Sequence, residues 1–313
     1  MINKKVAFIF PGQGSQTIGM GKSFVEGSDI AKDMMDKAST ALGINFEKLL
    51  FEENEDINKT ENTQPAILLV SLMAHAIFTS KSDIKPALLL GHSLGEFSAV
   101  SAAGALDPIE AVKLVNARGK LMQGACDEID ASMMVILGLK DDQVEEICKT
   151  AQNEGKKVWP ANYNQDGQIV VAGMKSDLAS MEAVFKEAGA KRAMLLNMSV
   201  ASHCPILEPA QAPLREKMDA VLTDTFIAPI VSNVSTEKYS TKAQALTLLT
   251  DQLTKPVRYK QSILAIADDV DIAIEFGNGK VLAGMNKRIN KEMKTYNIFD
   301  MGSLEAVLAE LNA

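Results

Sequence analysis

The fold is decided by one stretch of the chain, Lys85-Pro86-Ala87-Leu88-Leu89-Leu90-Gly91-His92-Ser93-Leu94-Gly95-Glu96-Phe97. Its short apolar run predicts a buried strand, and Gly91-x-Ser93-x-Gly95 then turns sharply into the apolar segment 97–103. A strand, a tight turn and a helix in this order are the context in which G-x-S-x-G is a nucleophile elbow. The stretch therefore predicts an α/β fold in which Ser93 is exposed as a nucleophile at the N-terminus of a helix.

Composition is typical of a globular protein and excludes several functions. The 313 residues are 47% hydrophobic and 23% charged, which is enough to bury a large core. The net charge of −8 argues against nucleic acid as a partner, because phosphate binding needs a basic surface. Three cysteines without C-x-x-C spacing predict neither a disulfide framework nor a zinc site, and we expect no metal.

The apolar segments are too short for export or membrane insertion. Val6–Phe10 is shorter than the core of a signal peptide and ends at Pro11-Gly12. The longest apolar segment, Ala66–Phe78, contains Ser71 and His75 and is too short to span a bilayer. We therefore expect a soluble, cytoplasmic protein that does not contact a membrane.

A glycine-rich loop, Pro11-Gly12-Gln13-Gly14-Ser15-Gln16, follows the buried strand predicted over 6–10. A dinucleotide-binding fingerprint would need glycine in place of Thr17, and a Walker A loop would need glycine in place of Gln16. Both nucleotide-binding interpretations therefore fail. What remains is a flexible loop after a central strand, where ligands approach α/β sheets.

Further elements are predicted on both sides of the elbow. Thr63 is placed to cap a helix over 64–78, and Asp107-Pro108-Ile109-Glu110 predicts the start of a helix that runs to about 124. Downstream, the apolar patterns predict strands over 230–234, 271–276 and 296–299, and helices over 241–253, from 279 and from 303.

The segment between these two groups has its own order of elements. Strands are predicted over 133–139, 158–162, 168–172 and 192–196, with helices over 141–151 and 176–188. This order, βαββαβ, is that of a ferredoxin-like unit. We therefore predict a ferredoxin-like small subdomain, residues 130–198, inserted into a large subdomain formed by residues 1–129 and 199–313.

Three histidines could serve as the base for Ser93. His75 lies among apolar residues and is interpreted as a hydrogen-bonded core histidine, and His92 as a brace of the elbow. His203, in the polar loop after the inserted unit, is by elimination the predicted general base. The neighbouring Cys204 is not predicted to be a nucleophile. Since no acidic residue stands out beside the histidine, a backbone carbonyl or an amide could orient it.

Arg118 is the most informative charged residue, because its neighbours at helical spacing are apolar. A buried guanidinium is unfavourable unless an anionic group meets it. Two interpretations stay open at this point: a structural Asp or Glu partner, or a bidentate clamp for a substrate carboxylate.

Backbone groups and a basic stretch complete the candidate sites. The N–H of Leu94, directly after the nucleophile, is predicted to be one donor of an oxyanion hole, and the N–H of Gln13 the second. Near the end of the chain stand Lys280, Lys287, Arg288, Lys291 and Lys294. They form either a solvated helix face or a docking patch for an acidic partner.

Taken together, several motifs resemble those of the malonyl-CoA:acyl-carrier-protein transacylases. They occur in the order of that family, over nearly the whole chain: Phe10-Pro11-Gly12-Gln13-Gly14-Ser15-Gln16, Gln64-Pro65-Ala66, Gly91-His92-Ser93-Leu94-Gly95-Glu96, Arg118-Gly119, Ser202-His203, Gln252 with Pro256-Val257, and Gly279-Lys280-Val281-Leu282. Two departures are Gly277-Asn278-Gly279, where the family has Gly-Pro-Gly, and Val200-Ala201-Ser202, where related polyketide acyltransferases vary with the extender unit.

The resemblance implies an α/β-hydrolase-like large subdomain with a ferredoxin-like insertion, in agreement with the order of elements above. It implies that Ser93 is the malonylated nucleophile and His203 its base, with Arg118 as the clamp for the substrate carboxylate. Gln13 and Leu94 match the oxyanion-hole positions. Gln252 matches the position that helps to orient the histidine through its backbone.

The resemblance also implies an activity. This is transfer of the malonyl group from malonyl-CoA to the phosphopantetheine thiol of acyl carrier protein, by a ping-pong mechanism in fatty acid biosynthesis that needs no metal or other cofactor. We expect malonyl-CoA and acyl carrier protein as partners, and a monomer. The alternatives are a trans-acting polyketide acyltransferase, a serine thioesterase or hydrolase, and a non-catalytic module that binds carrier protein.

Overall fold

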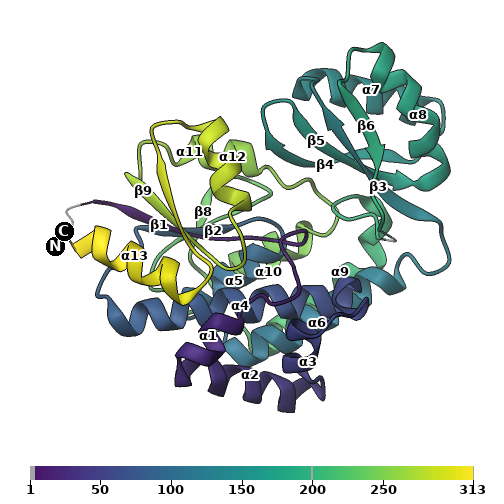
Figure 1. Cartoon of the computed structure of the whole chain (residues 1–313). Helices are drawn as coiled ribbons and strands as arrows, with labels where there is room; N and C mark the ends of the chain where they lie inside the picture. Colours follow the sequence, from purple (N-terminus) through teal and green to yellow (C-terminus); the bar gives the residue numbers. More distant parts are fainter. Residues whose placement is uncertain (1–3, 199, 313) are drawn as a thin grey trace.

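The computed structural model describes residues 4–198 and 200–312 and has a mixed α/β fold with two sheets (Figure 1). The larger sheet has six strands in the order β10-β9-β1-β2-β7-β8. Their bounds are β1 Val6–Phe10, β2 Leu88–Gly91, β7 Ile230–Val231, β8 Lys238–Tyr239, β9 Ile272–Phe276 and β10 Lys294–Ile298. Ser199 and the outermost residues of the predicted large subdomain (1–3 and 313) lie outside the described residues.

The central strand β1 pairs in parallel with β2 on one side and β9 on the other. All five of its residues are buried, as the apolar run over 6–10 predicts. Because β1 and β2 are parallel neighbours, the loops that follow them leave the same edge of the sheet, and these loops contain Gln13 and Ser93.

Helices cover both faces of this sheet. Phe8 and Phe10 pack in the core beneath the long helix α4, Thr60–Lys81, whereas Ala7 and Ile9 pack in a separate core with side chains of α11 and α12. The helices associated with this sheet are α1 Lys22–Gly27, α2 Asp29–Leu42, α3 Phe46–Phe51, α4, α5 Leu94–Ala102, α6 Pro108–Gly124, α9 Glu208–Val221, α10 Lys242–Asp251, α11 Tyr259–Ala265, α12 Val281–Ile289 and α13 Met301–Asn312, with short 3₁₀ turns at Asp56–Asn58 and Pro205–Leu207.

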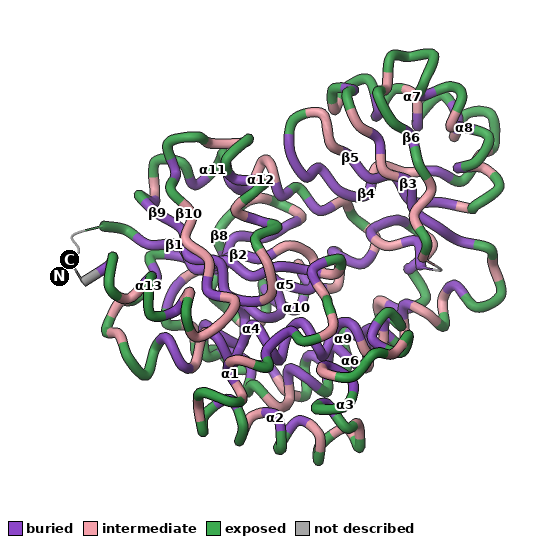
Figure 2. Tube along the Cα trace, in the orientation of Figure 1, coloured by how far each residue is buried: buried purple, intermediate pink, exposed green. Residues whose placement is uncertain are grey.

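The smaller sheet has four antiparallel strands in the order β4-β5-β3-β6 and its own core (Figure 2). Its elements follow one another in the chain as β3 Ala131–Leu137, α7 Asp141–Asn153, β4 Val158–Gln165, β5 Gln168–Met174, α8 Lys175–Glu187 and β6 Arg192–Leu195. The predicted order βαββαβ is confirmed, with bounds within three residues of those expected.

The start of α4 differs from the prediction. The helix begins at Thr60, and Thr63 lies inside it, where its hydroxyl donates to the carbonyls of Ile57 and Lys59. Pro65 is therefore inside the helix and leaves the carbonyl of Glu61 without its usual donor. The side-chain amide of Asn116 on α6 donates to that carbonyl at 2.8 Å, which allows the helix to continue through the proline.

Helix α4 is longer than the apolar segment over 66–78, which alone is too short to span a bilayer. With 22 residues, it is the one helix of the described chain that is long and apolar enough to cross a membrane by length and composition alone. However, 78% of its most apolar window is buried inside the protein, as in the core helix of a soluble protein.

Candidate active site

Ser93 lies on a strained turn between β2 and α5. Its φ of 52° and ψ of −104° are unusual for a residue other than glycine. Two close backbone approaches make this turn possible: a Cβ on Gly95 would lie 2.0 Å from the carbonyl oxygen of Phe10, and one on Gly91 would lie 2.0 Å from the carbonyl carbon of Gly95. The predicted strand, turn and helix around Ser93 are thus confirmed.

His203 is in contact with Ser93. The Ser93 Oγ and His203 Nε2 atoms are 2.8 Å apart, and His203 Nδ1 lies 2.6 Å from the backbone oxygen of Gln252. A carbonyl can only accept, so Nδ1 carries the proton and the lone pair of Nε2 faces the serine hydroxyl. Burial, aided by the charge of Arg118, lowers the pKa of His203 to about 3, so the ring is neutral and ready to accept a proton.

Arg118 is 1% exposed and lies beside the same serine. Its Nη1 donates to Gln64 Oε1 at 2.7 Å, and its Nη2 donates to Gln252 Oε1 at 3.1 Å and to Ser93 Oγ at 3.3 Å. Its Nε is buried and has no hydrogen-bond partner, and none of the ion pairs among the described residues includes Arg118. The guanidinium is therefore held by neutral groups and keeps a buried donor for an anion.

The loop after β1 packs against the elbow. A Cβ on Gly12 would lie 2.3 Å from the carbonyl oxygen of His92, and the side chain of Gln13 donates to Thr60 at 3.3 Å. Asn278 fastens the same loop, because its amide donates to the carbonyl of Ser15 at 2.6 Å and to the hydroxyl of Thr17 at 2.9 Å. In the loops and turns of the described residues, neither the backbone N–H of Gln13 nor that of Leu94 donates to another backbone group.

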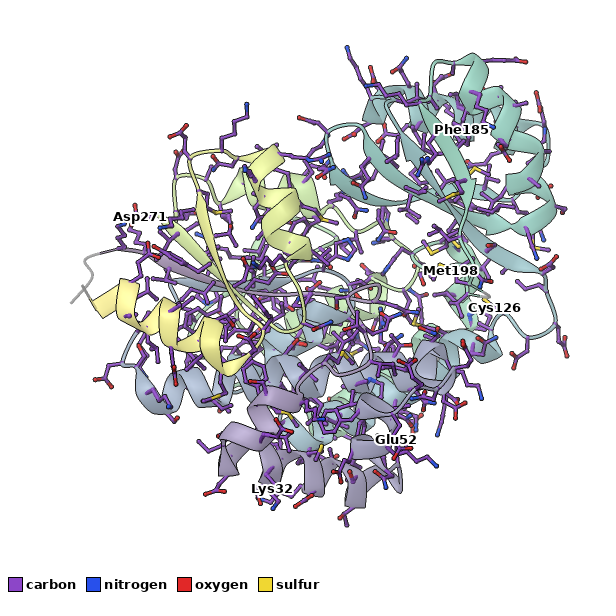
Figure 3. The ribbon with its side chains drawn as sticks, in the orientation of Figure 1. Lys32, Glu52, Cys126, Phe185, Met198 and Asp271 are labelled. Carbon is purple, nitrogen blue, oxygen red and sulfur yellow. The ribbon has the colours of Figure 1, made fainter. Side chains whose placement is uncertain are left out.

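These residues line one large cleft of about 1170 Å³. Gln13, Ser93, Leu94, Arg118 and His203 are all in its wall. The opposite wall comes from the smaller sheet, the start of α8 and the segment after β6: Met133, Asn162, Asn164, Val170, Lys175, Leu196 and Met198. Figure 3 labels Met198 at this position, with Phe185 farther away in the core of the smaller sheet.

The other histidines and Cys204 are not placed to react with a substrate. His92 donates from Nε2 to Asn164 Oδ1 at 2.8 Å, which confirms it as a brace of the elbow. His75 packs edge-on against Phe8 and Phe276, but its buried Nε2 has no hydrogen-bond partner among the described residues, so the expected hydrogen bond is wrong. Burial raises the pKa of the Cys204 thiol to about 12, which keeps it protonated and unreactive.

The basic stretch extends from the rim of the cleft. Val281, Leu282 and Met285 of α12 line the cleft, and Lys287 and Arg288 are exposed in the last turn of that helix. Lys294 differs from the others, because it pairs with Glu310.

Three residues of the site were not given a role from the sequence. Gln64 binds Arg118, Asn233 accepts the backbone N–H of Ser93 at 2.7 Å, and Glu96 is fully buried behind Gln252. A signal existed for Glu96, since it is the only charged residue of the apolar helix α5, whereas Gln64 follows a polar first turn of α4 and does not stand out. Asn233 has no comparable signal, because it follows a strand of only two residues.

Comparison with known proteins places the chain in a family. The acyl transferase domain family matches residues 7–298. The malonyl CoA-acyl carrier protein transacylase of Haemophilus influenzae is 39% identical over 97% of this chain and 98% of its own length. The crystal structure of malonyl-CoA:acyl carrier protein transacylase from Helicobacter pylori aligns with a TM-score of 0.96 at 46% identity and covers 99% of both chains.

A third relative was solved with a partner. It is a malonyl-transacylase in complex with its type II polyketide synthase acyl-carrier protein, and it aligns with a TM-score of 0.94 at 35% identity over 98% of this chain and 99% of its own. These relatives are more than 30% identical to this chain over nearly its full length. The contacts of Ser93 with His203 and Arg118 fit the acyl transfer that their names describe. This chain therefore belongs to the acyl transferase domain family, among the malonyl-CoA–acyl carrier protein transacylases.

Proposed function

We propose that the protein transfers the malonyl group of malonyl-CoA to the phosphopantetheine thiol of acyl carrier protein through a malonyl ester of Ser93. One observation carries this proposal: a buried arginine without an acidic hydrogen-bond partner lies within 3.3 Å of a serine that is paired with a neutral histidine. A serine hydrolase for uncharged acyl groups would gain nothing from that arginine.

The first half-reaction forms the ester. Ser93 Oγ attacks the thioester carbonyl carbon, and its proton moves to His203 Nε2, which the carbonyl of Gln252 orients through Nδ1. The oxyanion accepts hydrogen bonds from the N–H groups of Leu94 and Gln13. The carbon–sulfur bond then breaks, and the leaving thiolate of CoA takes the proton from His203.

The second half-reaction reverses these steps with a different thiol. His203 removes the proton of the phosphopantetheine thiol, the thiolate attacks the ester carbonyl, and the Ser93 oxygen leaves with the proton held by His203. The reaction converts one thioester into another through an oxygen ester, and these species differ only modestly in energy. We therefore propose that the residues present suffice without a metal or other cofactor. Water must be outcompeted by the thiol, and the cleft wall supplied by the smaller sheet helps to exclude it.

Arg118 selects the acyl group in this proposal. A carboxylate at the guanidinium would receive charge-assisted hydrogen bonds from a cation already desolvated by the protein. The carboxylate would also hold the acyl carbon beside Ser93, because Nη2 contacts the serine hydroxyl.

We also propose that the chain is divided into two subdomains. The parallel sheet (the larger sheet, which is parallel except for its edge strand β8) and its nucleophile elbow support an α/β-hydrolase-like large subdomain of residues 1–129 and 199–313. The strand order β4-β5-β3-β6 supports a ferredoxin-like subdomain of residues 130–198. We further propose that the enzyme acts as a cytoplasmic monomer without membrane or nucleic-acid partners, and that its carrier protein serves fatty acid synthesis.

A polyketide carrier is the second candidate acceptor. The relative solved with a type II polyketide synthase carrier protein favours it, since that relative matches this chain over nearly its full length. Transfer rates to the two classes of carrier protein, measured with the same malonylated enzyme, distinguish the two acceptors.

The substitution Arg118→Ala tests the selection step. We expect the rate of malonyl loading to fall about 100-fold relative to the rate of acetyl loading, since a buried charge–charge contact is lost. Lys113→Ala on the exposed face of the same helix is the control, and its loading ratio should match that of the wild type. An unchanged ratio of malonyl to acetyl loading in Arg118→Ala would refute the clamp.

A further inference from the structure

Glu96 is a buried carboxylate that the steps above do not use. It is 0% exposed and lies in the first turn of α5, three residues after the nucleophile. Three groups donate to it: the side-chain amide of Gln252 at 2.7 Å, the backbone N–H of Asn233 at 3.1 Å and the hydroxyl of Tyr239 at 3.0 Å. An ionised carboxylate only accepts, and each of these three hydrogen bonds is accepted by Glu96.

Gln252 connects this carboxylate to the reacting groups. Its side-chain nitrogen donates to Glu96, its side-chain oxygen accepts from Arg118 Nη2 at 3.1 Å, and its backbone oxygen accepts from His203 Nδ1. The orientation of this amide matters. Turned by half a rotation, it would place its oxygen against the Glu96 carboxylate and its NH₂ group against the guanidinium, and both contacts would be repulsive.

We propose that Glu96 is a positioning residue for malonyl transfer, which acts by fixing the orientation of Gln252 and through it the positions of Arg118 and His203. In a usual serine–histidine pair, an acidic residue contacts the histidine directly. Here Glu96 contacts Gln252 instead, and Gln252 contacts both His203 and Arg118. This inference rests on the proposed roles of Ser93, His203 and Arg118.

Charge supports the same assignment. Burial raises the pKa of Glu96 to about 7, while the hydrogen bonds from Asn233, Gln252 and Tyr239 and the positive charge of Arg118 act in the opposite direction. Burial lowers the pKa of Arg118 to about 10, and the negative charge of Glu96 acts against this shift. Three hydrogen bonds and one cation therefore offset part of the cost of burying this carboxyl group.

A second buried glutamate supplies a matched control. Glu275 on β9 is also 0% exposed, burial also raises its pKa to about 7, and it accepts from the backbone N–H groups of Leu282 and Ala283 and from Asn297. It has no hydrogen bond with Ser93, Arg118, His203 or Gln252 among the described residues. Substitution of either glutamate by glutamine removes one buried ionisable carboxyl group and keeps the side chain's shape.

The test compares Glu96→Gln and Glu275→Gln with the wild type. For each protein, the rates of malonyl and acetyl loading are measured per active site, by rapid quenching and intact-mass spectrometry, so that a loss of folded protein does not affect the result. In Glu96→Gln we expect the malonyl rate to fall about 10- to 100-fold and the malonyl-to-acetyl ratio to fall about 10-fold, because Arg118 acts only on the malonyl carboxylate. In Glu275→Gln we expect both values to stay within about twofold of the wild type.

The outcomes separate this inference from the proposed function. Failure of the wild type to load malonyl at all refutes the function and the inference with it. A wild type that loads normally, together with an unchanged malonyl-to-acetyl ratio in Glu96→Gln, overturns the role of Glu96 alone. If Glu96→Gln does not fold, Gln252→Leu, which removes the connecting amide but keeps the backbone carbonyl, must lower the same ratio or the inference is wrong.

Discussion

The two sheets of this molecule contribute differently to one cleft. The parallel sheet and its helices hold every residue to which we assign a chemical role: Gln13, Ser93, Leu94, Arg118, His203 and Gln252. The antiparallel sheet supplies lining side chains such as Met133 and Val170 and one brace, Asn164 on His92. Reactive groups lie at the carboxyl edge of parallel strands, where loops and helix N-termini converge, while the inserted sheet shapes the space in front of them.

The largest effect should follow a change at the parallel sheet's edge. In His203→Ala, we expect the rate of malonyl loading to fall about 10²- to 10⁴-fold, because the base that takes the Ser93 proton is lost. Val170→Ala in the opposite wall should lower the rate by less than about tenfold, since it removes only packing atoms. Rapid-quench loading measurements check both values, and equal losses in the two variants would remove the distinction between the sheets.

The next effect concerns stability and pH. The two buried carboxylates of the described residues, Glu96 and Glu275, both belong to the parallel-sheet region. Burial raises the pKa of Glu275 from 4.5 to about 7. A carboxyl group with a raised pKa in the folded state contributes stability below pH 4.5, and this contribution is lost as the pH rises to about 7.

The substitution Glu275→Gln removes that pH dependence. Between pH 4.5 and pH 8, the free energy of unfolding of the variant minus that of the wild type should increase by up to about 3 kcal/mol, because the wild type loses this stability and the variant does not. Urea unfolding at several pH values measures this difference. A difference that stays constant with pH, or changes in the opposite direction, contradicts the assignment of a raised pKa to Glu275.

The smallest effect should come from the link between the sheets. Asn164→Ala removes the hydrogen bond from His92, and we expect a loss of about 1 kcal/mol in unfolding free energy and a fall of about fivefold in loading rate. Asn153→Ala, at the exposed end of α7, is the control and should change neither. If Asn164→Ala also left both values unchanged, the hydrogen bond between His92 and Asn164 would not couple the two sheets.

Prediction from the sequence succeeded where local patterns are strong. The buried strand β1, the elbow, the Asp107 cap of α6 and the βαββαβ order were all predictable from apolar runs, glycines and capping residues. The candidate residues Ser93, His203 and Arg118 do come together in one cleft, and Gln252 contacts the histidine and the arginine.

What escaped prediction depends on tertiary contacts. Helix α9 contains Pro213, and a proline within a sequence pattern usually argues against a helix there. The strand β8 has only two residues, too few for any periodicity. The helix start at Thr60 depends on Asn116, which lies 55 positions away in the sequence and takes the carbonyl freed by Pro65. No local pattern contains that partner.

The most direct test of the account is intact-mass spectrometry of the protein after mixing with malonyl-CoA, followed by peptide mapping and addition of holo acyl carrier protein. The account predicts one malonyl adduct on the peptide that contains Ser93, absent in Ser93→Ala and discharged to the carrier protein. An adduct that persists in Ser93→Ala, or release of free malonate without transfer to the carrier, would contradict it.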